Sequence, residues 1–413
     1  MTRRVVITGM GAVTPVGNTV EETWQALLEG KNGIDYIKSI DTSNLKVKIA
    51  AEVKNLEIEK YLDAKEARRI DRCIILGLIA AKEAYEQSGL KDSDIDNYRF
   101  GTFVTSGIGG INTIYQQSLV AKEKGPDRIT PFFVPSAIIN LVGGNIAIKY
   151  QAKGGNLPVV TACSSGNDSI GYAFRSIRDN YLDIAFAGGA EAPICDLSLS
   201  GFGNMRALCT KNDPNAASTP FDKRRSGFVI GEGAGVLILE EYEHAKKRGA
   251  KIYGEIIGYG ATCDAYHITA PEESGEGIAK AIEFALADAK ISPELIDHIN
   301  AHGTSTPYND RLETLAFKKV FGDHAYKLNI CSTKSMIGHT LGACGGIEAI
   351  VTALSVKNNV IPPTINYQEF DEECDLNYTP NKKVERKIQY ALKENVGFGG
   401  QNSVLVFKKF SEE

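Results

Sequence analysis

Cys163 is the residue whose position in the sequence best suits covalent chemistry. It follows an apolar run and precedes small residues, which predicts a turn between a buried strand at 159–161 and a helix at 165–179. The free amides and positive dipole end of such a helix stabilise a thiolate, so we expect the pKa of this thiol to be lowered. The alternative is that Cys163 is one of eight buried cysteines with only a packing role.

Two of the six histidines, His302 and His339, stand among small residues. Small neighbours let a ligand and backbone approach an imidazole closely, although the common role of a single histidine is a hydrogen-bonded core side chain. His298 and His302 are four residues apart, but that spacing binds zinc on a helix, and this stretch is predicted as a strand. We therefore expect no metal site.

Other residues near these histidines suggest how they are held and what they face. Thr304 and Thr306 alternate on an expected extended loop and could hydrogen-bond a long polar ligand arm. Glycines 342, 345 and 346 fall in a predicted helix at 339–357, where each costs up to about 1 kcal/mol relative to alanine. That cost indicates close packing against another element, such as the helix that begins at Cys163.

Three further features have both a structural and a functional interpretation. Lys334 and Glu348 are expected to form an ion pair that holds the His339 segment, because a buried lysine needs a partner. Phe398 stands between glycines and is either a core side chain or the aromatic of a mobile loop. Four basic residues are predicted to share one helix face, which is either solvated or a dock for an acidic partner: Lys65, Arg68, Arg69 and Arg72.

Strand-length apolar runs alternate with helical stretches along the whole chain, which predicts an α/β protein with buried strands. Expected strands include 5–8, 99–105, 184–187, 298–301, 329–332 and 403–407. Each half contains a strand, a reactive-looking turn and a helix of small residues, which suggests a duplication with halves at 1–250 and 251–413. A solvated helix at 240–251 is expected to link the halves.

Composition excludes several classes of protein. The net charge of −5 argues against nucleic-acid binding by bulk electrostatics. No segment approaches the roughly 20 apolar residues that cross a bilayer. The cysteines are scattered without a CxxC pair, which is typical of the reducing cytoplasm.

The order of these motifs resembles the β-ketoacyl-acyl-carrier-protein synthases, most closely their elongating type II branch. The likeness extends over essentially the whole chain and includes PFFVP (131–135), TACSS (161–165), PFDKRRSGF (220–228), AHGTST (301–306), residues 334–342 and the terminal GFGG (397–400).

The resemblance implies a thiolase fold of two duplicated halves in five αβαβα layers, usually a homodimer. Cys163 would carry the acyl group, with its own amide and that of Phe398 as the oxyanion hole. His302 and His339 would bind the malonyl thioester and stabilise the enolate formed by decarboxylation. The chain would thus elongate fatty acids by two carbons on acyl carrier protein, in the cytoplasm and without a cofactor.

The resemblance also implies secondary roles. Lys334 and Glu348 match the ion pair near the second histidine, Phe398 matches the gating aromatic, and Thr304 and Thr306 match contacts to the pantetheine arm. Acyl-pocket positions are matched by Ile108, Phe133 and Phe202. The carrier-protein dock is matched by Lys65, Arg68, Arg69 and Arg206. Asn395, Val396 and Gln401 depart from the usual Ser, Phe and Thr, which leaves chain-length preference and gating open.

Several alternatives remain to be weighed. A thiolase would need a second catalytic cysteine near the end, and no cysteine follows Cys374. The initiating branch carries Asn in place of His339. A non-catalytic partner subunit would usually lack the nucleophile Cys163. An active ketosynthase of a polyketide pathway stays open.

Overall fold

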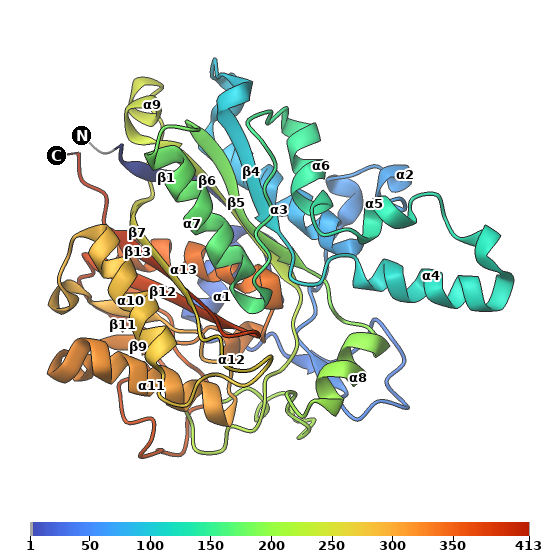
Figure 1. Ribbon diagram of the computed structural model, residues 1–413. Coiled ribbons are helices and arrows are strands. Elements are labelled where there is room, and N and C mark those ends of the chain that lie inside the picture. Colours follow the sequence, from blue (N-terminus) through green and yellow to red (C-terminus); the bar gives the residue numbers. More distant parts are fainter. Residues whose placement is uncertain (1–2, 413) are drawn as a thin grey trace.

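Two series of strands form the sheet layers of this protein, which a computed structural model describes over residues 3–412 (Figure 1). In the first series, β1 (Val5–Val13) pairs antiparallel with β6 (Gly233–Glu241), and β6 pairs antiparallel with β5 (Ile184–Glu191). The strand β5 then pairs parallel with β4 (Phe100–Thr105).

The second series has the same order of antiparallel and parallel neighbours. The strand β7 (Gly254–Cys263) pairs antiparallel with β13 (Gln401–Lys408), and β13 pairs antiparallel with β12 (Tyr390–Gly397). Parallel pairs follow between β12 and β8 (His298–Asn300) and between β8 and β9 (Asn329–Cys331). A short antiparallel pairing of β1 with β7 joins the two series into one nine-stranded sheet.

Two helices lie between the series of strands, and others cover the outer faces. The central helices are α7 (Ser165–Arg178) and α13 (Cys344–Asn358), which contact each other and strands of both series. On the outside, α3 (Arg72–Ser88) packs on β1, and α10 (Glu276–Ala289) packs on β7. This is the thiolase fold with five αβαβα layers, as expected from the sequence.

Shorter elements connect the layers. The remaining strands are β2 (Asp35–Tyr36), β3 (Ile49–Ala50), β10 (Val360–Ile361) and β11 (Val384–Glu385). The remaining helices are α1 (Val20–Leu28), α2 (Ala64–Ala67), α4 (Ile111–Lys124), α5 (Phe133–Ala137), α6 (Leu141–Tyr150), α8 (Asp196–Asn204), α9 (Tyr242–Lys247), α11 (Pro307–Phe321) and α12 (Lys334–Ile337).

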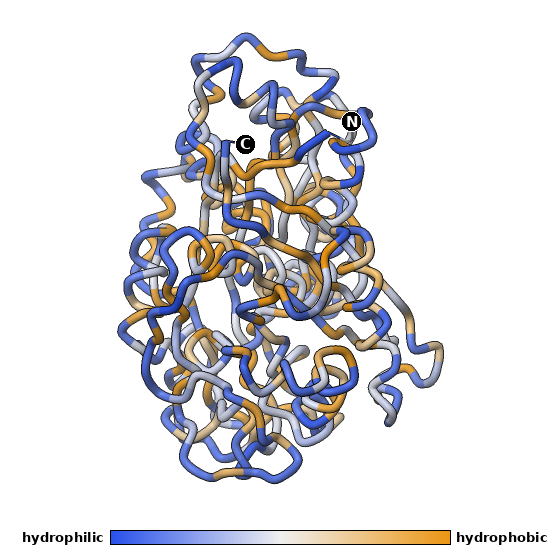
Figure 2. The backbone as a smooth tube through the Cα atoms, turned by 90° about the vertical axis from the view of Figure 1, so that its left-hand side faces the viewer, coloured by the Kyte–Doolittle hydropathy of each residue, from blue (hydrophilic) through white to orange (hydrophobic). Residues whose placement is uncertain are grey.

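The hydrophobic core follows the layers. Figure 2 shows hydrophobic segments inside the molecule and hydrophilic ones in the outer loops, and every residue of α13 from Cys344 to Val356 is buried. A helix buried on all sides needs an apolar or small residue at almost every position, which explains its glycines and alanines. None of the helices within residues 3–412 combines the length and the apolar character needed to cross a membrane.

Most of the expected elements are confirmed, but the strand at 159–161 is wrong. These residues belong to no strand, and Asn156, shortly before them, forms an isolated bridge with Thr102. Val160 is 47% exposed. The apolar run thus lies at a surface of this chain, although its composition is typical of a buried strand.

Two helix predictions also need correction. The helix expected at 339–357 begins only at Cys344, so His339 lies in the preceding loop. The helix expected at 240–251 is shorter, since α9 covers only Tyr242–Lys247, and it is solvated on one face, because Tyr242 and Ala245 are buried. Glu240 is fully buried and accepts hydrogen bonds from Arg248 Nε at 2.7 Å and Thr8 Oγ1 at 2.8 Å.

Candidate active site

Cys163 lies in a tight turn at the start of α7, as the sequence predicts. The turn is a short 3₁₀ segment (Ala162–Ser164), and Ala162 adopts a left-handed backbone with φ of 52°. The Ser165 hydroxyl stabilises it by accepting from the Thr161 amide at 2.9 Å and donating to the Ala162 carbonyl at 2.6 Å. A non-glycine residue held in this strained region is a common sign of a functional turn.

The pKa of the Cys163 thiol differs from the expectation. Burial raises it to about 12, while the Lys334 charge and the backbone amides of Phe398 and Cys163 act in the opposite direction. A helix end is worth at most about 2 kcal/mol to an anion, whereas removing an anion from water costs several kcal/mol. Burial therefore outweighs the helix end, and the thiol carries its proton.

His339 is held against Cys163 by its own backbone. Its amide donates to the Val229 carbonyl at 2.7 Å, and its Nε2 lies 3.0 Å from Cys163 Sγ. The Leu341 amide donates to its Nδ1 at 3.3 Å. Since a backbone amide can only donate, Nδ1 is the acceptor, and Nε2 carries the ring hydrogen that points to the sulfur.

His302 lies in the loop after β8 and faces His339. The two ring centres are 5.2 Å apart, and the rings are nearly perpendicular at 86°. The His302 amide donates to Glu313 Oε1 at 2.7 Å and to Glu394 Oε2 at 3.0 Å, which fixes the backbone. Its Nδ1 lies 3.0 Å from Asn395 Nδ2.

Both imidazoles are neutral at physiological pH. Burial and then the charge of Lys334 lower the pKa of His302 and of His339 well below the ordinary value, and Lys393 adds to the effect. A neutral imidazole can donate from one nitrogen only. The site can thus present two hydrogen-bond donors beside a thiol.

The same three side chains have the composition of a metal site. One ligand atom from each of Cys163, His302 and His339 lies within 4.8 Å of the others. A metal, however, needs a ring nitrogen without hydrogen. Because the Leu341 amide donates to Nδ1 of His339, the Nε2 of this ring that faces the sulfur carries hydrogen, and the arrangement fits a carbonyl oxygen better than a metal.

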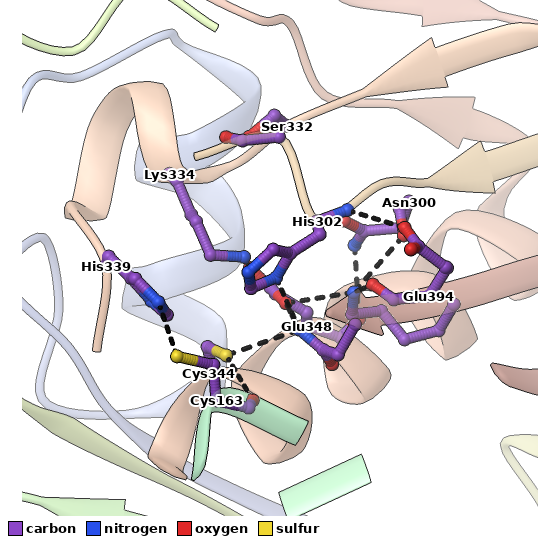
Figure 3. A network of polar contacts seen from close by, with 12 residues as sticks. Cys163, Asn300, His302, Ser332, Lys334, His339, Cys344, Glu348 and Glu394 are labelled. Carbon is purple, nitrogen blue, oxygen red and sulfur yellow. Dashed lines mark hydrogen bonds and ion pairs between the residues drawn. The ribbon is translucent and has the colours of Figure 1, made fainter. Parts of the chain in front are cut away.

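Behind the histidines lies a buried ion network (Figure 3). Lys334 Nζ is 2.5 Å from Glu348 Oε1, as expected from the sequence, and Lys393 Nζ is 3.0 Å from Glu348 Oε2. All three side chains are at most 1% exposed. Lys393 also donates to the carbonyls of Asn300, at 3.3 Å, and of Glu394.

Sequence reasoning missed four members of this network: Glu313, Cys344, Lys393 and Glu394. Burial and the neighbouring Glu394 charge raise the pKa of Glu313 well above its ordinary range. The available signal was a run of polar residues, Lys-Glu-Asn at 393–395, within an otherwise apolar strand. A polar run at such a position indicates a buried network, but its partners lie on other elements.

The thiol and the histidines open into a pocket of about 580 Å³. Its other walls include Phe202, Arg206, Thr304, Thr306 and Phe398. The two threonine hydroxyls are 2.9 Å apart, and the Phe202 and Phe398 rings are 6.3 Å apart. These five expected residues therefore surround one cavity.

Two residues expected at the acyl pocket do not line this cavity. Ile108 packs in the same hydrophobic cluster as Cys163, away from the pocket wall. Phe133 lies half-buried on α5 and does not border the pocket within this chain.

Close backbone contacts bring the separate elements to the sulfur. A Cβ atom at Gly397 would lie 2.5 Å from the Thr161 carbonyl oxygen and 3.2 Å from the Cys163 nitrogen. A Cβ atom at Gly345 would lie 2.2 Å from the Asn167 nitrogen on α7. The expected close packing between the glycine-rich helix and the helix at Cys163 is thus confirmed.

The basic cluster is arranged differently from the prediction of one helix face. The helix α2 ends at Ala67, and Asp71 caps the new helix α3 by accepting from the Cys73 amide at 3.0 Å. The cap turns Arg72 away to pair with buried Glu232 at 2.6 Å. The other three basic residues are exposed: Lys65, Arg68 and Arg69.

Two family descriptions match the chain. "Beta-ketoacyl synthase, N-terminal domain" matches residues 2–245, and "Beta-ketoacyl synthase, C-terminal domain" matches residues 253–368. Similar proteins named 3-oxoacyl-(acyl-carrier-protein) synthase 2 occur in Synechocystis sp., at 47% identity over 99% of this chain and 98% of the relative, and in Staphylococcus aureus, at 49% identity over 99% of both.

A solved structure also matches the complete chain. It contains a type II PKS acyl-carrier protein in complex with its ketosynthase bound to the hexaketide, and the match has a TM-score of 0.92 at 38% identity over 100% of both chains. A β-ketoacyl synthase structure from Burkholderia phymatum has the same TM-score at 34% identity, covering 99% of this chain and 100% of the other.

Proposed function

Because the chain belongs to the β-ketoacyl synthase family, we propose that it condenses a malonyl group on acyl carrier protein with an acyl group held on Cys163. The reaction releases carbon dioxide and lengthens a fatty acyl chain by two carbons. The observation that carries the proposal is the meeting of the thiol with two neutral imidazoles in one pocket, with His339 Nε2 3.0 Å from Cys163 Sγ.

The first half-reaction is a thioester exchange. Cys163 Sγ attacks the carbonyl carbon of the acyl carrier thioester, and the amides of Cys163 and Phe398 stabilise the oxyanion. The carbon–sulfur bond to the carrier breaks, and the departing thiolate takes the proton that Cys163 loses. Since one thiol replaces another, the raised pKa of Cys163 slows the attack but does not disfavour the exchange.

The second half-reaction forms the carbon–carbon bond. His302 and His339 donate from Nε2 to the carbonyl oxygen of the malonyl thioester. The carbon–carbon bond to the carboxylate breaks, and carbon dioxide leaves. The electron pair of that bond stays on the thioester and forms an enolate, whose negative oxygen the two donors stabilise. The enolate carbon attacks the acyl carbonyl on Cys163, the carbon–sulfur bond breaks, and the thiolate takes a proton from solvent. The cycle balances without a cofactor or a metal.

The other residues of the site have proposed supporting roles. Lys334 and Glu348 hold the His339 loop through a buried ion pair, and Phe398 moves to admit substrate. Thr304 and Thr306 contact the pantetheine arm, because both residues line the same pocket as Cys163. Phe202 borders the acyl chain directly, Ile108 packs behind it in the same hydrophobic cluster, and Phe133 completes the proposed acyl pocket.

Mass spectrometry of the Cys163 peptide tests this function. Incubation with an acyl carrier thioester should add one acyl mass, and malonyl carrier should then yield carbon dioxide and a 3-oxoacyl product. Cys73, which is buried and does not line the pocket, is the internal control and should stay unmodified. An unmodified Cys163 without release of carbon dioxide would overturn the proposal.

An iterative ketosynthase of a polyketide pathway is the second candidate. It is favoured by the structural match to the type II PKS ketosynthase at 38% identity, whereas relatives named for 3-oxoacyl synthesis reach 49%. A ladder of acyl carriers separates the two. The fatty acid function predicts one condensation on each saturated acyl primer, and the polyketide function predicts repeated condensation on unreduced 3-oxoacyl chains.

Acyl carrier protein is the proposed partner, and Lys65, Arg68, Arg69 and Arg206 are its proposed dock. The first three are exposed, and Arg206 lies at the pocket mouth. Replacing Lys65 and Arg68 by Glu should raise the KM for acyl carrier at least several-fold with little change in kcat, because only the encounter is weakened. Lys247→Glu on α9 is the matched control, and an equal KM in both variants would exclude the dock.

We also propose that two copies of the chain associate. The helix α4 stands away from the body in Figure 1 and has no buried residue, although it carries Ile111, Ile114, Tyr115, Leu119 and Val120. Exposed apolar side chains gather in the adjoining segments at Phe132, Val134, Ile138, Ile148, Leu157 and Val160. Such a surface is typical of an interface between subunits.

Two more proposals concern organisation and location. The repeated strand order supports a duplication, with halves at 1–250 and 251–413 that carry the cysteine and the two histidines respectively. Eight free cysteines, seven of them buried, fit a cytoplasmic protein. Fractionation of the source cells would test the location.

A further inference from the structure

Asn395 joins the ion network to one of the two imidazoles. It lies on β12, three residues before Phe398, and its side chain is fully buried. Its Nδ2 is 3.0 Å from His302 Nδ1, 3.3 Å from Glu348 Oε2 and 3.3 Å from Cys344 Sγ. The two amide hydrogens are shared among these three groups.

The orientation of the amide follows from its neighbours. Glu348 is held by Lys334 and Lys393 through one oxygen each, and an ionised carboxylate can only accept hydrogen bonds. Cys344 donates its own hydrogen to the Cys163 carbonyl at 3.2 Å and thus presents lone pairs to the amide. A reversed amide would place its oxygen 3.3 Å from a carboxylate oxygen, a repulsive contact.

The orientation of the amide decides the tautomer of His302. With Nδ2 toward the ring, Asn395 donates and His302 Nδ1 accepts, so the ring hydrogen stands on Nε2. His339 reaches the same tautomer differently, because the backbone amide of Leu341 donates to its Nδ1. The Asn395 side chain therefore fixes the donor of His302, and the Leu341 backbone amide fixes the donor of His339.

We propose that Asn395 is the positioning residue that holds His302 in the Nε2–H tautomer and thereby supplies the second hydrogen-bond donor to the enolate. The role rests on the proposed function for its catalytic consequence, whereas the tautomer can be measured without turnover. Asn395 touches no reacting atom and acts through His302.

Nitrogen-15 NMR of labelled histidine tests the tautomer directly. In the wild-type protein, the His302 spectrum should show a hydrogen-bearing Nε2 and a bare Nδ1, with the signal assigned by its loss in His302→Gln. At a pH at which the new carboxyl group of Asn395→Asp is ionised, it can only accept, so the hydrogen should move to Nδ1. Asn395→Ser offers a hydroxyl donor and should keep it on Nε2. Asn212→Asp, outside the pocket, is the matched control.

The rate of malonyl decarboxylation in each variant should depend on the tautomer of His302. Asn395→Asp should lower malonyl decarboxylation by about 10²- to 10³-fold, the usual effect of losing one oxyanion donor. Acylation of Cys163 should change by no more than a few-fold, and Asn395→Ser should recover most of the decarboxylation.

Each other outcome has a defined meaning. A wild-type His302 with its hydrogen on Nδ1, or an Asn395→Asp protein that keeps it on Nε2 while the new carboxyl group is ionised, would overturn the proposal. Equal losses of acylation and decarboxylation would indicate a structural role only. If Asn395→Asp does not fold, the wild-type and Asn395→Ser spectra still decide. A wild-type protein that shows the tautomer but no decarboxylation would refute the proposed function and leave the tautomer assignment intact.

Discussion

Burial favours the uncharged form of the three side chains at the centre of the site. Burial keeps hydrogen on the Cys163 thiol and keeps His302 and His339 neutral. The same burial strengthens a hydrogen bond to any charge that develops inside the pocket. The thiol and the two imidazoles are thus uncharged before substrate binds. We expect them to stabilise negative charge when the substrate introduces it or the reaction forms it.

The raised pKa of Cys163 predicts how its alkylation depends on pH. With a pKa of about 12, the thiolate fraction rises about tenfold per pH unit throughout the neutral range. The rate of iodoacetamide labelling should therefore keep rising from about pH 6 to about pH 9. Peptide mass spectrometry gives this rate, and a plateau below about pH 8 would contradict the protonated resting thiol.

The lowered pKa of both histidines predicts a decarboxylation rate that is flat on the acid side. A histidine with an ordinary pKa would gain a proton between about pH 7 and about pH 6. Since both pKa values lie well below the ordinary value, the rings stay neutral there, and the rate of malonyl decarboxylation should not change. Carbon dioxide release at saturating substrate is the measurement, and an acid limb centred near pH 6.5 would contradict it.

At the scale of elements, glycines decide how closely the central helices approach. The start of α13 lies against the start of α7, because Gly345 leaves room for the Asn167 backbone. The approach places the His339 loop beside the Cys163 turn. Glycine lowers the helix propensity at these positions, but it allows the two backbones to come into contact.

Gly345→Ala should destabilise the protein by about 1–3 kcal/mol, the usual cost of overpacking. The added Cβ would meet the Asn167 nitrogen at 2.2 Å, so the two helices must separate. Denaturant unfolding monitored by circular dichroism gives the change in free energy. Gly201→Ala on α8 has nothing within 4 Å and should instead stabilise, by about 0.5–1 kcal/mol. Equal effects of the two substitutions would refute the close-packing argument.

The whole molecule has an asymmetry that the site alone does not explain. Both halves expose large hydrophobic side chains, among them Ile268 and Phe284 in the second half, but those of the first half gather around α4, α5 and α6. The segment 156–161 belongs to that surface and leads directly into the Cys163 turn. A second copy of the chain that covers this surface would therefore also hold the Cys163 turn in place.

Association should be sensitive to charge on that surface. Ile148 on α6 is 73% exposed, and Ile148→Arg should shift the protein from dimer to monomer in analytical ultracentrifugation, because a buried unpaired charge is costly. Phe284→Arg on α10 is the matched control, since Phe284 is 54% exposed in the other half. A dimer in both variants, or a monomeric wild-type protein, would contradict the proposed interface.

The sequence by itself determined the location of most strands and helices, and it singled out Cys163, His302 and His339. These inferences depend on local information, namely apolar periodicity, glycine content and the position of a residue relative to its own strand or helix. The expected strand at 159–161 and the shared face of the basic cluster were wrong, because the first segment lies at an exposed surface of this chain and a helix cap at Asp71 interrupts the second.

Only the tertiary structure decided the chemical state of the site. The protonation of Cys163, the tautomer of His302 and the partners of Lys393 depend on groups from distant parts of the chain. Cys163 and His339 are 176 residues apart, and His302 and Asn395 are 93 residues apart. Burial and hydrogen-bond direction are properties of the assembled layers, so no local pattern of residues can encode them.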